Sequence, residues 1–166
     1  MEVCTKSSRY NTVDTACRDD APGFIAPLAP RGCLMTVDLR IRFAVDDEAL
    51  SRLDADAFGG DRTVVPWKAR LERHSRSWVG AFVGARLVGF VHAVWDGGNH
   101  AFLLDTAVAP DLRRRRIGSD LVDALLGDLR ELGIEWLHVD YEPHLHSFYR
   151  DACGFGATDA GLLRLN

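Results

Sequence analysis

Four consecutive arginines, Arg113–Arg116, are the residues whose type and position most strongly indicate chemistry. They lie between a strand-like segment that ends at Val108 and a helix-like segment that begins at Ile117. A helix N-terminus carries about half a positive charge, so each arginine placed there is unfavourable by some tenths of a kcal/mol. Free N–H groups at a helix start, together with guanidinium groups, form a good binding site for phosphate or pyrophosphate. We therefore interpret this arginine turn (residues 113–116) as the binding site of an anionic ligand.

Two other interpretations of the arginine turn stay open on the residues alone. In the first, it is a solvated basic turn with Asp111 as the helix N-cap. In the second, it is a nucleic-acid surface. The chain carries 20 Lys and Arg against 24 Asp and Glu, a net charge of −4, and no aromatic residues interleave with the arginines. A general nucleic-acid or anionic-membrane binder would show a basic excess, so we expect neither partner.

The cysteines and histidines do not have the spacing of a metal site. The cysteines (Cys4, Cys17, Cys33 and Cys153) form no CxxC or CxxH pair. His144 and His146 are two residues apart, which on a helix does not place them on one face. Two further histidines, His92 and His138, lie in strand-like segments. We expect no metal, and we expect Cys153 to be a small buried residue at a helix end.

The elements that must position the arginine turn follow from the hydrophobic periodicity. Alternation predicts strands, and apolar residues spaced three and four apart predict helices. After residue 36 the predicted order is β-α-α-β-β-β-α-β-α-β, an α+β arrangement with one right-handed βαβ crossover. The predicted strands are Val37–Phe43, Trp78–Val83, Leu87–Trp95, His100–Val108, Ile134–Tyr141 and Ala157–Leu165, and the predicted helices start at Asp46, Trp67, Ile117 and Pro143.

The first 36 residues read differently from the rest of the chain. They contain three of the chain's six prolines, and their apolar residues show neither the two-residue period of a strand nor the 3.6-residue period of a helix. We expect a loosely ordered leader over residues 1–36 and one domain over residues 37–166, with Met35 as an alternative natural start. Residues 1–20 lack the apolar core of a secretory signal, and no apolar run approaches the ~20 residues of a membrane span. Our expectation is a cytoplasmic protein.

The segment around the arginine turn resembles motif A of the GNAT superfamily of acetyl-CoA-dependent N-acetyltransferases. That motif is a strand, V-x-P, and then [Q/R]-x-x-G-x-[G/A] at the start of a long helix. Val108 and Pro110 match, Arg113 takes the Q/R position, and Gly118 takes the last small position. Arg116 departs from the motif, because the family usually has glycine there.

A second segment raises the specificity of the resemblance. Phe148, Tyr149, Gly154 and Phe155 match the family's F-Y-x-x-x-G-F segment, which follows the strand after motif A. The resemblance covers about Leu39–Leu165. It implies the GNAT fold, a mixed central sheet of six to seven strands flanked by about four helices.

The resemblance implies transfer of an acetyl group from acetyl-CoA to the primary amine of a small molecule or peptide, by direct attack in a ternary complex. The pantetheine arm would pair with the backbone near Ala107 and Val108, and the Val108 N–H would stabilise the thioester oxygen. The pyrophosphate would lie on the turn and the helix start, which comprise Arg113, Arg114, Arg115, Arg116, Ile117, Gly118 and Ser119.

The same resemblance supplies candidates for proton transfer. Tyr149 matches the family tyrosine and is the candidate general acid, with a contact to the cofactor. Asp105, Asp140 and Glu142 are candidate bases near the place where the two strands would separate. Asp105 lies in an apolar strand, where it could instead be a structural partner of a backbone N–H or an arginine. Asp140 and Glu142 could instead attract a cationic acceptor.

A second function of a different class is a catalytically inactive GNAT-fold module that binds CoA or a partner, which the arginine at position 116 favours. The sequence does not identify the acceptor amine, and it leaves a homodimer open. Among the tryptophans, Trp67 is a candidate for the acceptor pocket.

We predict that residues 1–34 are dispensable for folding, because their prolines and lack of periodicity exclude a packed element. A chain that starts at Met35 should melt cooperatively at nearly the temperature of the full chain, as measured by circular dichroism. A melting temperature lower by more than several degrees would show that the first residues pack on the domain.

Overall fold

The computed structural model describes residues 35–165. Our expectation of a loosely ordered leader over residues 1–36 therefore concerns residues outside this range, except for residues 35 and 36. Within the range, the chain forms an α+β fold, as predicted.

A mixed sheet of five strands organises the domain, in the order β1-β2-β3-β4-β5. The first four strands pair antiparallel, whereas β4 and β5 pair parallel through the crossover helix α3. The strands are β1 (Asp38–Ile41), β2 (Ser75–Val83), β3 (Arg86–Trp95), β4 (His100–Val108) and β5 (Trp136–His138).

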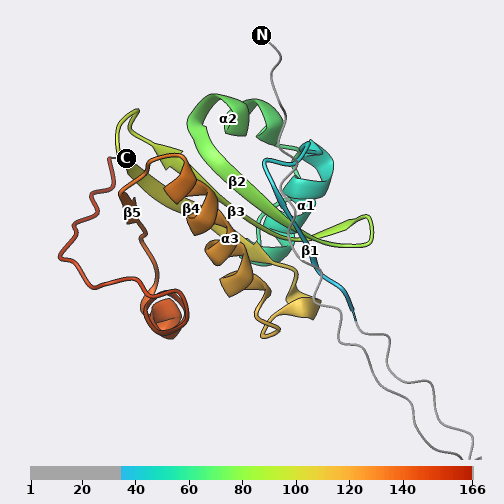
Figure 1. The fold of residues 1–166 in the computed structure, drawn as a ribbon. Helices are drawn as coiled ribbons and strands as arrows, with labels where there is room; N and C mark the ends of the chain where they lie inside the picture. Colours follow the sequence, from blue (N-terminus) through green and yellow to red (C-terminus); the bar gives the residue numbers. More distant parts are fainter. Residues whose placement is uncertain (1–34, 166) are drawn as a thin grey trace, which may run out of the picture. The chain divides into compact units, whose positions relative to one another are not determined.

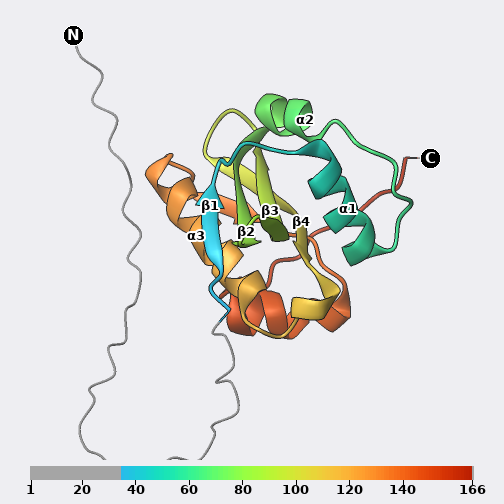
Figure 2. The same ribbon diagram turned by 90° about the vertical axis from the view of Figure 1, so that its right-hand side faces the viewer.

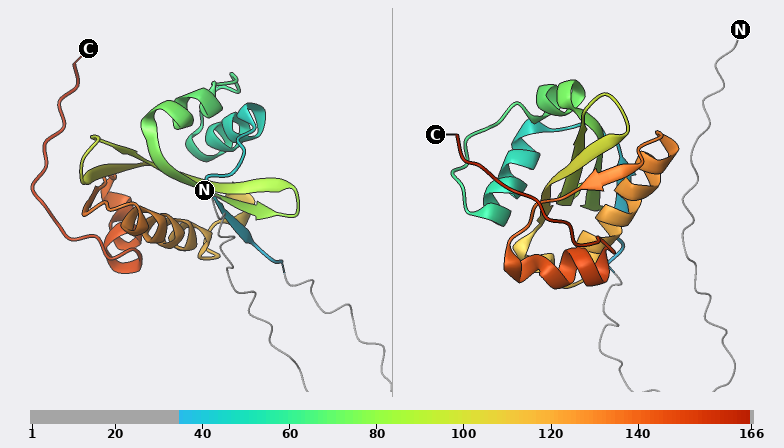
Figure 3. Two further views of the ribbon diagram at one scale, coloured as in Figure 1. Left: turned by 45° about the horizontal axis from the view of Figure 1, so that its top comes forward. Right: turned by 90° about the vertical axis from the view of Figure 1, so that its left-hand side faces the viewer.

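Helices cover both faces of the sheet. Helices α1 and α2 lie on one face, and α3 lies on the other (Figures 1 and 2). The two turned views show the short helix η3 on the same side as α3 (Figure 3). The helices are α1 (Asp47–Phe58), α2 (Trp67–His74) and α3 (Ile117–Glu131), with the short helical segments η1 (Pro110–Leu112), η2 (Pro143–Leu145) and η3 (Ser147–Ala152).

Local signals explain where the long helices begin and end. Asp46 caps α1, since its Oδ1 accepts hydrogen bonds from the backbone N–H of Glu48 and Ala49 at 3.0 and 3.1 Å. Gly133 follows α3 with φ +79°, the left-handed conformation that glycine adopts without a steric penalty. The start of α1 at Asp46 was predicted from the sequence.

Buried apolar side chains between the sheet and the helices form the core. The fully buried ones include Leu50 of α1, Leu71 of α2, Phe90 of β3, and Leu121 and Leu125 of α3. Trp67 is 2% exposed and packs edge-on against Phe90, so it belongs to this core, and the sequence-based idea of Trp67 as a pocket residue is wrong.

The last third of the chain is less regular than predicted. The strand expected over residues 134–141 is reduced to the three residues of β5, and the helix expected from Pro143 to Gly154 is split into η2 and η3. The final strand predicted over residues 157–165 is wrong, because this segment has no regular structure and Leu162, Leu163 and Leu165 are 80–92% exposed. The described sheet thus has five strands rather than six or seven.

One buried polar network joins the α3 side of the sheet to β1. Asp128 of α3, 5% exposed, accepts hydrogen bonds from Ser77 Oγ at 2.6 Å and from the Arg42 guanidinium at 2.8 Å. A buried carboxylate is tolerated where such partners satisfy it.

We predict that Asp128→Ala lowers the free energy of unfolding by about 1–3 kcal/mol, because it leaves the buried Ser77 hydroxyl without its partner. Urea unfolding measures the change. Asp56→Ala is the control, since it removes an exposed ion pair with Arg62 and should cost only about 0–1 kcal/mol. Equal effects of the two substitutions would contradict a structural role for the buried network.

Candidate active site

Strand β4 separates from β5 after a short stretch of pairing. The two strands pair only from His100 opposite Trp136 to Phe102 opposite His138. From Leu103 to Val108, the edge of β4 that faces β5 has no strand partner in the described sheet. The predicted opening beside Ala107 and Val108 is therefore present, and we call it the β4–β5 opening.

A bulge in β4 lies beside this opening. On the β3 side, Phe90 pairs with Ala107 and His92 pairs with Leu104, so Asp105 and Thr106 together face one residue of β3. Asp105 has φ +53°, a left-handed conformation that is uncommon for residues other than glycine. The bulge re-aims the Asp105 side chain toward the face of the sheet that carries α1 and α2.

Asp105 ends a hydrogen-bonded chain that crosses three strands. His92 Nε2 lies 2.9 Å from Asp105 Oδ2, and Ser75 Oγ lies 2.8 Å from His92 Nδ1. A neutral imidazole satisfies both contacts when its Nε2–H donates to the carboxylate and the Ser75 hydroxyl donates to Nδ1. His92 is only 1% exposed and stacks on Phe90, so the chain is held by the core.

Two charged side chains from the covering helices face Asp105. Arg70 of α2 lies 3.9 Å from Asp105 Oδ2, and Asp54 of α1 interacts with both. The hydrogen bond from His92 is the main cause that lowers the pKa of Asp105, against the opposing effect of burial. The pKa of Asp54 is raised by burial and by the nearby Asp105 carboxylate, so the two carboxylates repel each other.

Tyr149 reaches the opposite side of the bulge. It is 6% exposed and lies among Tyr141, Phe148 and Phe155, with a ring separation of 4.9 Å from Tyr141. Burial raises the pKa of its phenol, and the Thr106 hydroxyl offsets part of this effect. The two hydroxyls do not form a well-aligned hydrogen bond, since Thr106 Oγ1 is buried with no such partner in the described part of the chain.

Not all four guanidinium groups of the arginine turn are available to an anionic ligand, although the residue types suggest that they are. Arg113 Nη2 donates to the Ala57 carbonyl at 2.9 Å, so this guanidinium is committed to the end of α1. Asp111 pairs with Arg86 through two contacts of 2.9 Å, and residue 116 is the N-cap of α3. The alternative in which Asp111 caps this helix is therefore wrong.

Arg114 and Arg116 both adopt left-handed backbone conformations, with φ +64° and +65°. Neither guanidinium makes a hydrogen bond or an ion pair within residues 35–165. The first-turn N–H groups of Ile117, Gly118 and Ser119 have no acceptor within the helix. The helix start thus offers backbone donors beside two uncommitted cations.

Gly118 brings the two sequence motifs together. A Cβ atom at this position would lie 3.1 and 3.2 Å from atoms of the Phe148 ring, so glycine lets η3 approach the start of α3 closely. The motif at residues 108–119 and the motif at residues 148–155 therefore meet at the β4–β5 opening.

The two remaining candidate bases lie elsewhere than Asp105. Asp140 and Glu142 are exposed in the segment after β5, and neither side chain forms a hydrogen bond or ion pair with another described residue. Sequence reasoning identified Asp105 and offered an arginine as one possible partner, which the nearby Arg70 matches, but it did not identify the partners His92 and Ser75. A polar residue at 92 within an otherwise apolar strand was the one available signal.

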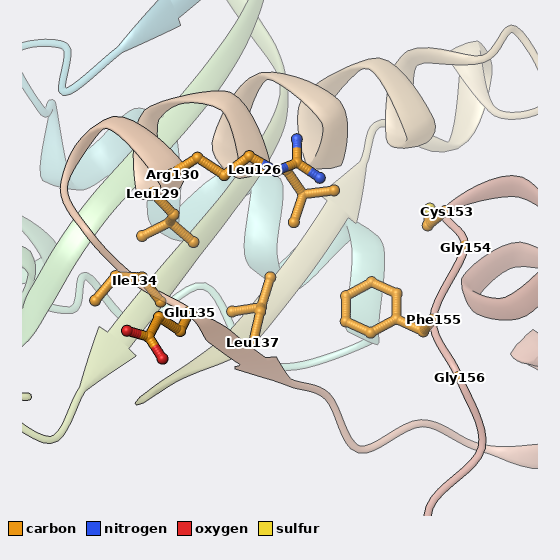
Figure 4. Close-up of a pocket in the computed structure, with 10 residues that line it drawn as sticks. All are labelled: Leu126, Leu129, Arg130, Ile134, Glu135, Leu137, Cys153, Gly154, Phe155 and Gly156. Carbon is orange, nitrogen blue, oxygen red and sulfur yellow. The ribbon is translucent and has the colours of Figure 1, made fainter. Parts of the chain in front are cut away.

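A cavity of about 270 Å³ lies between the second half of α3 and residues 153–156 (Figure 4). Its lining is mainly apolar and includes Leu126, Leu137 and Phe155. Burial raises the pKa of Cys153 in this lining to about 11, so its thiol stays protonated at neutral pH.

Within residues 35–165, no three His, Cys, Asp or Glu side chains gather in a way that could hold a metal ion. No helix in this part of the chain is both long enough and apolar enough to cross a bilayer.

Comparison with known proteins identifies the family. The model of the acetyltransferase (GNAT) family matches residues 44–155, which is more than half of the chain. The chain belongs to this family, and the resemblance seen in the two motifs is confirmed.

Individual relatives are more distant. An uncharacterized N-acetyltransferase, ycf52, from Porphyra purpurea is 35% identical over 65 residues, which span 39% of this chain and 37% of that protein. The structure of a Trypanosoma brucei acetyltransferase aligns with a TM-score of 0.68 and 18% identity, over 79% of this chain and 99% of the other. An aminoglycoside N-acetyltransferase, AAC(6')-Iy, solved in complex with CoA, aligns with a TM-score of 0.63 and 21% identity, over 84% and 99% of the two chains. The two structural matches establish a shared fold.

Proposed function

We propose that the protein transfers the acetyl group of acetyl-CoA to the primary amine of a small molecule or peptide, by direct attack within a ternary complex. One observation carries the proposal. The β4 bulge places an ionised carboxylate and a buried phenol on either side of the same three residues, Asp105–Ala107, beside an unpaired strand edge.

The residues at the opening fit acetyl-CoA. The unpaired edge at Ala107 and Val108 can accept the amides of a pantetheine arm as a short added strand. The N–H groups of Ile117–Ser119, with Arg114, Arg115 and Arg116, would hold the pyrophosphate. Arg113 supports this site indirectly, because its guanidinium holds the turn against α1. When bound, acetyl-CoA supplies an activated acyl group and a thiolate leaving group.

Asp105 is the proposed general base. The amine must lose a proton as its nitrogen attacks the thioester carbon, and Asp105 accepts this proton directly or through one water. The buried contacts of Ser75 and His92 hold the carboxylate in place and keep it ionised at neutral pH. Asp140 and Glu142, exposed and unpaired, would attract a cationic acceptor toward the opening.

Tyr149 is the proposed general acid. As the carbon–sulfur bond breaks, the sulfur takes up negative charge, and the phenol donates its proton there. Its raised pKa keeps the phenol protonated until this moment. The Val108 N–H would stabilise the charge that builds on the thioester oxygen.

A second candidate function is an inactive module that binds CoA or a partner. The specific observation in its favour is the left-handed arginine at position 116, where the family usually has glycine. This side chain occupies space in which a pyrophosphate would approach the backbone.

A thermal shift with acetyl-CoA, followed by an assay of CoA release with a panel of amines, tests the proposal. Acetyl-CoA at 100 times its Kd should stabilise the fold by about 2.7 kcal/mol. Stabilisation together with release of CoA supports the enzyme, and stabilisation with no turnover on any amine supports the inactive module. No stabilisation contradicts the enzyme and also the form of the inactive module that binds CoA.

We predict that Arg116→Gly stabilises the free protein and weakens acetyl-CoA binding. Glycine removes a left-handed arginine, a gain of about 1 kcal/mol, and deletes a charge-assisted contact, a loss of about tenfold in affinity. Chemical unfolding and calorimetric titration measure the two effects. Arg116→Ala is the matched control, because it deletes the guanidinium but retains the left-handed strain. Unchanged affinity in both variants would exclude Arg116 from the binding site.

The proposed base gives a pH prediction. Because Asp105 acts only when ionised and the His92 hydrogen bond lowers its pKa, His92→Phe should move the acidic limb of kcat/KM to higher pH. Ser75→Ala should shift it in the same direction while leaving the imidazole in place. Ser77→Ala removes a neighbouring buried hydroxyl on β2 and should leave the limb unmoved. A limb that stays fixed in the first two variants would transfer the role of base to Asp140 or Glu142.

We also predict that Tyr149→Phe lowers kcat by roughly 10²–10⁴-fold with little change in acetyl-CoA affinity, because only the acid is lost. Steady-state kinetics and titration separate the two quantities. Tyr141→Phe is the control, since its ring stacks on Tyr149, and its kcat should remain within a few-fold of wild type. A Tyr149→Phe enzyme with normal kcat and reduced stability would make the tyrosine purely structural.

A further inference from the structure

A row of four aromatic rings runs across the start of β4 and β5. The rings of His100 and Trp136, of His100 and His138, and of Phe102 and His138 stack with interplanar angles of 20–21° and centroid separations of 6.5, 5.1 and 4.8 Å. His100 Nδ1 also lies 2.8 Å from His138 Nε2, which fixes the two imidazoles to each other. We call these four residues the ring ladder.

The two large apolar residues of the ring ladder, Phe102 and Trp136, are exposed to solvent. Trp136 is 61% exposed and Phe102 is 44% exposed, and the next residue on this side of β4, Leu104, is 37% exposed. A contiguous exposed apolar surface of this kind commonly marks a binding site.

The ring ladder lies on the same face of the sheet as Asp105. His92 pairs with Leu104, and Phe102 pairs with Val94, so these side chains share a face. His92 contacts Trp67 of α2, which identifies it as the face that α1 and α2 partly cover. The surface continues along β4 from Phe102 through Leu104 to Asp105, a distance of about 10 Å at the usual rise per residue.

The charges at the end of this surface favour a cation. Asp54 and Asp105 lie together, and the Arg70 guanidinium faces both. The two carboxylates outnumber this guanidinium. An ammonium group is therefore drawn to the end of the ring ladder at which the proposed base lies.

We propose that the ring ladder is part of the acceptor site and binds a planar ring, so that the acceptor is a primary amine carrying an aromatic ring a few bonds from its nitrogen. The inference rests on the proposed function and names its substrate class. The amine lies at Asp105, and the ring stacks on the face of Phe102 that His138 leaves free, over Leu104. Offset stacking on parallel rings favours a flat aromatic body over an aliphatic one of equal size.

The test uses the full chain, acetyl-CoA and matched amines, with release of CoA as the readout. The probes are 2-phenylethylamine, 2-cyclohexylethylamine, which has a similar size but no planar ring, and n-butylamine. We expect kcat/KM for 2-phenylethylamine to exceed that for the cyclohexyl analogue by about tenfold, the equivalent of one strong stacking contact. Equal values for the ring-bearing and the cyclohexyl amine would overturn the inference.

Substitutions assign the effect to the ring ladder. Phe102→Ala should raise KM for 2-phenylethylamine by about tenfold while kcat and the values for n-butylamine stay within about twofold. Trp95→Ala is the matched control, because Trp95 is also exposed but lies on the opposite face, where it contacts Arg76. Equal effects of Phe102→Ala and Trp95→Ala would overturn the proposal.

Two other occupants of the ring ladder are outcomes of the same experiments. A dimer in size-exclusion chromatography that Trp136→Ala dissociates would assign the surface to a second copy of the chain. If the chain's own last residues cover the surface, changing Leu162, Leu163 and Leu165 to serine would expose Trp136. An added quencher would then reduce the Trp136 fluorescence more strongly than in the wild type, and this result would assign the surface to those residues. Either result overturns the acceptor site.

Failure of this inference is distinguishable from failure of the proposed function. If acetyl-CoA stabilises the protein and some amine is acetylated without a preference for rings, only the inference fails. If acetyl-CoA does not stabilise the protein, the proposed function fails with it.

Discussion

The bulge in β4 is the constraint on which the candidate site depends. Asp105 adopts a left-handed conformation that costs free energy for a residue with a Cβ atom, and it is held there by its hydrogen bond to the buried His92. The bulge turns Asp105 toward α1 and α2, places the Thr106 hydroxyl by Tyr149, and precedes the strand edge that β5 leaves unpaired. Without the bulge, the Asp105 carboxylate and the Tyr149 phenol would not lie on either side of residues 105–107.

The start of α3 shows a second departure from local preference. Two arginines take left-handed conformations next to a helix N-terminus, where their charge is also unfavourable. Such violations of local rules are typical of functional sites, where a ligand supplies the compensating interaction. The uncommitted guanidinium groups of Arg114 and Arg116 are consistent with an anionic ligand, and Arg113 shows that a cation in the same run can instead be structural.

Much of the fold was predictable from the sequence because its signals are local. The alternation over residues 100–108 and the helix start at Asp46 each act over a few residues, and each was predicted correctly. The two motifs also indicated the family and the place where they meet.

The features that sequence reasoning missed depend on residues far apart in the chain. The partner of Asp105 lies 13 residues away on another strand, and the bulge that joins them has no local signature. Residues 157–165 have the residue types of a strand, but a strand needs a partner, and β5 offers an edge of only three residues. Likewise, the hydrogen bond from Arg113 to the end of α1 follows from the packing of α1 beside the turn and not from the position of Arg113 in the motif.

The most direct test of the central claim is a titration with acetyl-CoA followed by the amide signals of the isotope-labelled full chain in NMR spectra. The account predicts that the largest shifts fall on residues 105–108 and 114–119, where the unpaired strand edge and the helix start lie. Shifts concentrated instead on residues 126–137 and 153–156, around the apolar cavity beside α3, would contradict it.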